Sequence, residues 1–222
     1  MSKGDKNKSG LVPSEAAALS RPGASSLIRR GMQDLLARAE AEDCLKRGQQ
    51  FLVQKMYEEA VECFWRGLQL DPNHPVVQLK IGEAFLRGKG VQQDWTQAFY
   101  WFRKAAEQGD ADAQCTLGNS YFYGYGVPQD DVQSELWCRK AAEQGLARAQ
   151  YTLGLLYHSG YGVLPDDVQA ASWIRKAAQQ GYAVAQFTLG FLYEEGRGVP
   201  QDDVQSALWF RKAAEQGFAR KQ

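Results

Sequence analysis

The sequence predicts an all-α solenoid, in which helical hairpins stack one after another. A block of residues recurs four times at a fixed period of 36 residues, without a gap. The stretch "GVPQDDVQSELWCRKAAEQG" at 126–145 returns almost unchanged as "GVPQDDVQSALWFRKAAEQG" at 198–217. Within each block, apolar residues recur at the spacing of one helical face. A fixed period of this length is typical of units that bury their apolar faces only against their neighbours.

The first half of each block predicts one helix. In "ARAQYTLGLLYHSG", Leu153, Leu156 and Tyr157 stand at i, i+3 and i+4, so they share a face. A Gly-x-Gly follows at 160–162 and predicts the end of this helix, because glycine accepts the left-handed backbone angles of a helix exit.

The second half predicts another helix. An aspartate in each block stands where an N-cap oxygen would accept bonds from free backbone amides: Asp94, Asp130, Asp166 and Asp202. Ala170, Trp173, Ile174 and Ala177 then recur at i, i+3, i+4 and i+7. We therefore expect Trp173 to be a buried anchor of the hairpin, and the glycine of "EQG" or "QQG" to end the helix.

The region before the four blocks is related but different. Residues 41–75 resemble a tetratricopeptide repeat through Gly48, Phe51, Tyr57, Ala60, Phe64 and the closing Asp71-Pro72. Residues 27–41 predict a further helix ahead of it. We interpret 1–26, which is basic and rich in Lys, Ser, Gly and Pro, as a disordered tail. The predicted organisation is therefore a tail (1–26), a helix with one repeat (27–75) and four units (76–113, 114–149, 150–185 and 186–222).

The four units resemble Sel1-like repeats. The residues that carry this resemblance are "LGNSYFYGYGV" with "WCRKAAEQG", "LGLLYHSGYGV" with "WIRKAAQQG", and "LGFLYEEGRGV" with "WFRKAAEQG". The first copy departs from the pattern at Ile81 and Phe85. The resemblance implies a right-handed α-superhelix that serves as an adaptor or scaffold in protein complexes, with no shared catalytic residue or cofactor.

Composition and charge argue against several classes of partner and cellular setting. Lys plus Arg and Asp plus Glu both number 26, so no basic excess favours a nucleic-acid partner. No run approaches the ~18 apolar residues of a membrane span. Pro13 and Glu15 interrupt the apolar stretch near the N-terminus, which argues against a secretory signal. Four irregularly spaced cysteines favour a reducing, cytoplasmic setting over a disulfide framework.

Candidate chemical sites have plainer structural interpretations. The paired acids Asp130-Asp131, Asp166-Asp167 and Asp202-Asp203 fit helix starts better than acid–base catalysis, because the pair repeats with the fold. Two histidines and scattered cysteines predict no metal site. The Arg-Lys pairs form a basic stripe that could take an anion, although Glu107, Glu143 and Glu215 stand four residues after Arg103, Arg139 and Arg211. We therefore predict a non-enzymatic protein, the alternative being a weak hydrolase acting through Cys115 or His158.

We expect a protein or peptide partner to bind the first helix of each unit. These helices line the concave face in the related tetratricopeptide repeats. Four slots, numbered relative to the Leu-Gly glycine (−3, +1, +4 and +5), vary from copy to copy, so the fold does not dictate them. Their occupants are Leu79, Glu83, Leu86 and Arg87; Cys115, Asn119, Phe122 and Tyr123; Tyr151, Leu155, His158 and Ser159; and Phe187, Phe191, Glu194 and Glu195. Exposed apolar residues of this kind favour an interaction surface. For Tyr151 and Phe187, burial between repeats is the alternative.

The C-terminal end predicts a possible self-association. Gln78, Gln114, Gln150 and Gln186 occupy one slot, and the next member of this series is Gln222, the last residue. "FARKQ" is too short to cover the fourth unit. We therefore expect Trp209, Phe210 and Phe218 to be partly open and available to a partner or a second copy.

Overall fold

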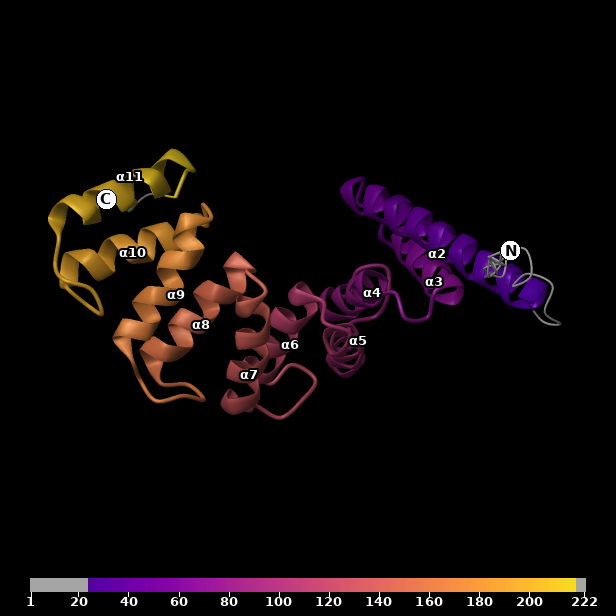
Figure 1. The fold of residues 1–222 in the computed structure, drawn as a ribbon, viewed down its shortest axis with the longest axis horizontal. Coiled ribbons are helices and arrows are strands. Elements are labelled where there is room, and N and C mark those ends of the chain that lie inside the picture. The colour runs from indigo at the N-terminus through magenta and orange to yellow at the C-terminus, as the bar shows by residue number, and fades with distance from the viewer. Residues whose placement is uncertain (1–23, 219–222) are drawn as a thin grey trace, which may run out of the picture.

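The protein is an elongated arc of helical hairpins (Figure 1). The computed structural model describes residues 24–218, which form ten helices and no strand. In chain order these are α2 (Ala24–Val53), α3 (Tyr57–Leu70), α4 (Pro75–Arg87), α5 (Trp95–Glu107), α6 (Ala111–Tyr123), α7 (Asp131–Glu143), α8 (Ala147–Ser159), α9 (Asp167–Gln179), α10 (Ala183–Glu195) and α11 (Asp203–Glu215). The predicted all-α solenoid is confirmed. Residues 1–23 of the expected tail, and Gln222, lie outside the described residues.

None of the helices within residues 24–218 combines the length and the apolar character needed to cross a membrane.

The N-terminal hairpin differs from the expectation of a separate helix over 27–41. Residues 24–53 form one continuous helix, α2. The reason is that "MQDLLARAEAEDCLKR" at 32–47 contains neither glycine nor proline and consists largely of strong helix formers. As a result, α2 extends well past the end of α3 (Figure 1).

The four predicted N-caps are confirmed. Asp130 Oδ1 accepts from the backbone N–H of Gln133 at 3.0 Å, and Asp166 Oδ1 accepts from that of Gln169 at 2.9 Å. Asp94 and Asp202 cap α5 and α11 in the same way. The second acid of each pair is the first residue of its helix, where a negative charge is favourable. The paired acids therefore serve the fold.

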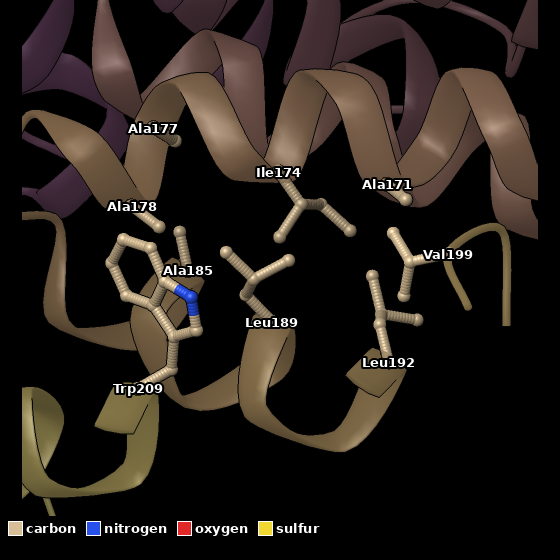
Figure 2. Close-up of a cluster of buried hydrophobic side chains, with 9 residues drawn as sticks. All are labelled: Ala171, Ile174, Ala177, Ala178, Ala185, Leu189, Leu192, Val199 and Trp209. Atoms are coloured by element: carbon tan, nitrogen blue, oxygen red, sulfur yellow. The ribbon is translucent and has the colours of Figure 1, made fainter. Parts of the chain in front are cut away.

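The core lies between successive hairpins. Figure 2 shows Ile174 of α9 facing Leu189 and Leu192 of α10, with the Trp209 ring closing one end of the cluster. The expectation for Trp173 needs correction, because its ring is only half-buried. It packs against a neighbouring cluster that includes Leu153, and Lys176 Nζ lies 3.6 Å from the ring centroid. One face of the indole therefore meets a cation instead of the core.

A ladder of glutamine side chains joins the repeats, with one buried and one exposed glutamine in each pair. Gln150 Nε2 donates to the carbonyl oxygen of Ala142 in the preceding repeat at 3.1 Å. Gln180 Nε2 donates to Gln150 Oε1 at 2.8 Å and to the carbonyl oxygen of Gly145 at 2.9 Å. The same amide pair occurs in each repeat: Gln78 with Gln108, Gln114 with Gln144, Gln150 with Gln180, and Gln186 with Gln216. The repeated glutamines are therefore packing residues with satisfied amides.

Replacing Gln150 by leucine is expected to lower the free energy of unfolding by about 2 kcal/mol. Leucine has a similar size but removes two hydrogen bonds, the one to the Ala142 carbonyl and the one from Gln180, and each such bond contributes about 0.5–1.5 kcal/mol. Urea denaturation followed by far-UV circular dichroism measures the change. Gln179→Leu, at an exposed position, is the control. Equal midpoints for the two variants would contradict a structural role for the ladder.

Candidate protein-binding surface

A cleft opens on the first helices of the second and third repeats. It has a volume of about 410 Å³ and lies between α6 and α8. Its lining comprises Asn119, Phe122, Tyr123, Arg148, Tyr151, Thr152, Leu155, Leu156, Ser159, Tyr161 and Tyr182. Of the predicted residues, Asn119, Phe122, Tyr123, Tyr151, Leu155 and Ser159 are thus brought together in one cleft.

The helical phase of α8 explains which side chains reach the cleft. Leu153 is fully buried, and Gly154 lies so close to α9 that a Cβ there would come within 2.5 Å of Ile174 Cγ1. The face that carries these two residues is therefore fixed against the hairpin partner. Leu155 and Ser159 then point to the other side, and Leu155 is 37% exposed.

A row of aromatic rings crosses three repeats beside this cleft. Phe122 contacts Tyr123 and Tyr161, with ring centroids 4.9 and 5.3 Å apart. Tyr123 stacks on Tyr125 at 5.3 Å, and Tyr125 contacts Trp95 at 5.1 Å. Tyr123 is 60% exposed and Trp95 is 47% exposed. These rings offer solvent a continuous aromatic surface, which we name the aromatic row (Trp95, Phe122, Tyr123, Tyr125 and Tyr161).

Polar groups in the cleft are few. Arg148 Nη2 donates to Asp112 Oδ1 at 3.1 Å across the repeat boundary. Thr152 Oγ1 donates to the carbonyl oxygen of Arg148 at 3.1 Å. The half-buried Asn119 amide also lines the cleft. The cleft therefore combines apolar walls with a small number of hydrogen-bonding groups.

The expectation that Leu79 is exposed is wrong. Leu79 is 5% exposed and packs with Ala113 and Leu117 of the next repeat. Cys115, in the same slot, is fully buried with Leu153 of the repeat that follows. This −3 slot points across the repeat boundary, which the helical periodicity of one repeat does not reveal. Tyr151 is intermediate, because it packs against the core beside Tyr182 and also lines the cleft.

The predicted residues of the first repeat lie outside the cleft. Glu83 accepts from Lys80 Nζ at 3.1 Å and lies 3.8 Å from Arg87, which is exposed. Leu86 is half-buried against the core of the first two repeats. In the third repeat, His158 Nδ1 lies 2.7 Å from Asp167 Oδ1, and this pair also lies outside the cleft. Glu83 and Arg87 line a much smaller cavity of about 20 Å³, and all four predicted residues remain candidates.

The predicted residues of the fourth repeat belong to a phenylalanine cluster. Phe187 contacts Phe191, Phe210 and Phe218, with ring centroids 5.0, 5.4 and 5.2 Å apart. Phe187 and Phe210 are half-buried, and Phe218 is 38% exposed.

The end of the described chain is less open than the sequence suggested. The expectation that Trp209 is open is wrong, because it is 8% exposed within its own core. Glu194 is half-buried, whereas Glu195 is exposed and lies 3.6 Å from Arg197.

The side chains considered for chemistry are engaged in packing. Burial raises the pKa of the Cys115 thiol, with Arg148 opposing the shift, and burial raises the pKa of Cys138 to about 12. Neither thiol is therefore a ready nucleophile at neutral pH.

The basic stripe is partly neutralised as expected. Arg103 and Arg211 pair with Glu107 and Glu215. Arg139 differs, because it pairs with Glu135 on the preceding turn and donates to Tyr157 Oη.

Several residues of this surface were missed by the sequence analysis. Tyr161 and Tyr182 lie in loops, and Arg148 and Thr152 lie on α8 outside the four slots considered. The sequence does contain a signal for two of the rings. The residue between the paired glycines is Tyr125 in the second unit and Tyr161 in the third, and a large aromatic residue in a turn between helices is typical of an exposed ring.

Stacked two-helix repeats with an exposed first-helix face define an α-solenoid repeat protein. The Sel1 repeat family matches residues 75–110, 111–146, 147–182 and 183–218, and the chain belongs to this family. The last three repeats begin three residues before the boundaries expected from the sequence, at the first residues of α6, α8 and α10. Repeats of this kind generally mediate protein–protein interactions.

Solved structures support the assignment. The chain is similar to a protective antigen of uropathogenic Escherichia coli strains with an SLR fold, at 34% identity and a TM-score of 0.73, over 87% of this chain and 41% of that chain. It is similar to a Sel1 repeat protein from Oxalobacter formigenes at 34% identity and a TM-score of 0.71, over 79% of this chain and 69% of that chain. Among curated proteins there is no match.

Proposed function

We propose that this protein is a non-enzymatic adaptor that binds a protein or peptide partner in the cleft between α6 and α8. The observation that carries the proposal is the aromatic row beside the cleft. Tyrosine and tryptophan are enriched in protein interfaces and dominate their binding energy, because each provides a large apolar surface with a polar edge.

The shape and chemistry of the cleft favour an apolar side chain presented by a peptide. A volume of about 410 Å³ accommodates one or two large side chains. The Asn119 amide and the tyrosine hydroxyls can bond the peptide backbone that flanks those side chains. The four cysteines are free thiols, which supports a reducing compartment, and we place the adaptor in the cytoplasm.

The weak hydrolase alternative gains no support from the site. Cys115 is fully buried with a raised pKa, and His158 is engaged with Asp167 outside the cleft. We therefore assign this chain a binding role without catalysis.

Replacing Tyr123 by alanine is expected to weaken peptide binding at least tenfold and to leave the helicity unchanged. Tyr123 is exposed and central in the aromatic row, and truncating such an anchor typically costs about 2 kcal/mol of binding energy. Peptides selected from a displayed random library on the purified protein would be titrated by fluorescence polarisation.

Tyr100→Ala is the matched control, because Tyr100 is a tyrosine on α5, 46% exposed, that does not line the cleft. The proposal fails if the selected peptides bind Tyr123→Ala as tightly as the unaltered protein. It also fails if only Tyr100→Ala weakens them, since the partner surface would then lie on the second helices.

A further inference from the structure

The first half of α2 presents an apolar stripe that nothing within the described residues covers. The exposed large apolar residues of this half are Leu27 (71% exposed), Ile28 (50%), Met32 (61%), Leu35 (67%) and Leu36 (61%). Ile28, Met32, Leu35 and Leu36 recur on successive turns and form a continuous band, which we name the α2 stripe. Leu27 stands nine residues before Leu36, so it points to the opposite side of the helix and is not part of the stripe. No other helix in residues 24–218 exposes this many large apolar side chains.

The α2 stripe lies away from the rest of the solenoid in two respects. Cys44 of α2 is buried toward α3, where it approaches Gly67. Leu35 stands nine residues before Cys44, or two and a half helical turns, and therefore points to the opposite side. In addition, α2 runs past the end of α3, so the stripe lies on a projecting helix (Figure 1).

We propose that the α2 stripe pairs with the same stripe of a second copy of this chain, as two antiparallel helices. Ile28, Met32, Leu35 and Ala39 follow the four-three-four spacing of a helix–helix seam. In the antiparallel register that sets Met32 against Leu35 of the second copy, Ile28 meets Ala39, and every layer is apolar. The apolar layers of this register lie within residues 28–39 of α2.

The charges beside the α2 stripe select this antiparallel arrangement. Arg29 and Glu40 stand eleven residues apart, which places both on the same edge of the helix, and both are exposed. In the antiparallel register, Arg29 lies within about 3 Å, along the axis, of the level of Glu40 of the second copy. The two-fold symmetry forms this pair twice. In a parallel pair, the edge that carries Arg29 and Glu40 would instead face the opposite edge of the second copy, so these two residues would not meet.

The area of the contact predicts a weak, concentration-dependent dimer. Each large aliphatic side chain contributes about 100 Å² of apolar surface, so the four residues of the α2 stripe from each copy bury roughly 800 Å². This value lies below the standard range of specific interfaces and is typical of weak, transient ones. We therefore expect a dissociation constant roughly in the micromolar range.

Sedimentation equilibrium of the full chain over a concentration series tests the proposal. The average mass of the unaltered protein should rise from the monomer value of 24.8 kDa toward twice that value. Leu35→Glu should keep the monomer mass at every concentration. It should not alter the circular dichroism spectrum, because the Leu35 side chain is 67% exposed. Val204→Glu, at a position 77% exposed on α11, is the control and should associate normally.

The charge pair gives a second, sharper test. Arg29→Glu should weaken the dimer about fivefold or more, because it removes two attractive pairs and sets a new carboxylate against Glu40 of the second copy. Adding Glu40→Arg to that variant should restore the dimer, because opposite charges then face each other again, with their positions exchanged.

Four outcomes would overturn the proposal. These are a monomer at several hundred micromolar, association that persists in Leu35→Glu, association that Phe218→Glu abolishes instead, and a charge swap that fails to restore the dimer. The first would assign the α2 stripe to a different occupant, and the third would place self-association at the phenylalanine cluster.

Discussion

Replacing Gly162 by alanine is expected to lower the free energy of unfolding by about 4 kcal/mol. Gly162 has φ +70°, a conformation that costs an L-residue roughly 1–2 kcal/mol. A Cβ at this position would also lie 2.0 Å from the carbonyl oxygen of Asp131 and 2.9 Å from the backbone nitrogen of Val132. Both atoms belong to the N-terminus of α7 in the preceding repeat, so the loop and the helix would have to separate.

The chain offers a control that isolates the clash from the backbone conformation. Gly181 has φ +86°, but a Cβ there would meet nothing within 4 Å. Gly181→Ala is therefore expected to cost only about 1 kcal/mol. Urea denaturation of both variants, followed by circular dichroism, gives the comparison. Equal losses would mean that the contact between loop and preceding repeat relaxes freely, and that it contributes little to stacking.

This contact also shows what a sequence can and cannot predict in such a fold. The Gly-x-Gly was interpreted as a helix exit, which is correct for Gly160, the left-handed C-cap of α8. The role of Gly162 is different, because it allows the loop to touch Asp131 of the preceding repeat. Helix exits follow from local backbone preferences. Contacts between repeats depend on the rotation from one repeat to the next, which no short stretch of sequence encodes.

The same distinction explains the outcome at the candidate site. The +5 slot, which includes Tyr123, was correctly expected to be exposed, because its direction depends on the phase of a single helix. The prediction that the −3 slot is exposed was wrong at Leu79, since its surroundings come from the next repeat. Tyr182 of the cleft lies just before α10, and only the stacking of the third and fourth repeats brings it to α8. The N-caps were predictable because an aspartate bonds amides two or three residues ahead.

Replacing Leu153 by alanine is expected to lower the free energy of unfolding by about 3–5 kcal/mol. Its side chain is fully buried in a cluster with Cys115, Ala141 and Ala149, so truncation leaves a cavity that joins two repeats. Because each repeat is stabilised by its neighbours, we expect a broader unfolding transition as well as a lower midpoint.

Leu155→Ala removes the same atoms from the same helix two residues later and should behave differently. Leu155 is 37% exposed at the wall of the cleft, so its truncation should cost less than about 1 kcal/mol of stability. It should instead weaken binding of the selected peptides several-fold, whereas Leu153→Ala should leave their affinity nearly unchanged at temperatures where it is folded. Two residues on one turn of α8 would then have different roles, Leu153 in stability and Leu155 in binding. If Leu155→Ala destabilised the protein as much as Leu153→Ala, both faces of α8 would be core, and the cleft could not be a binding surface.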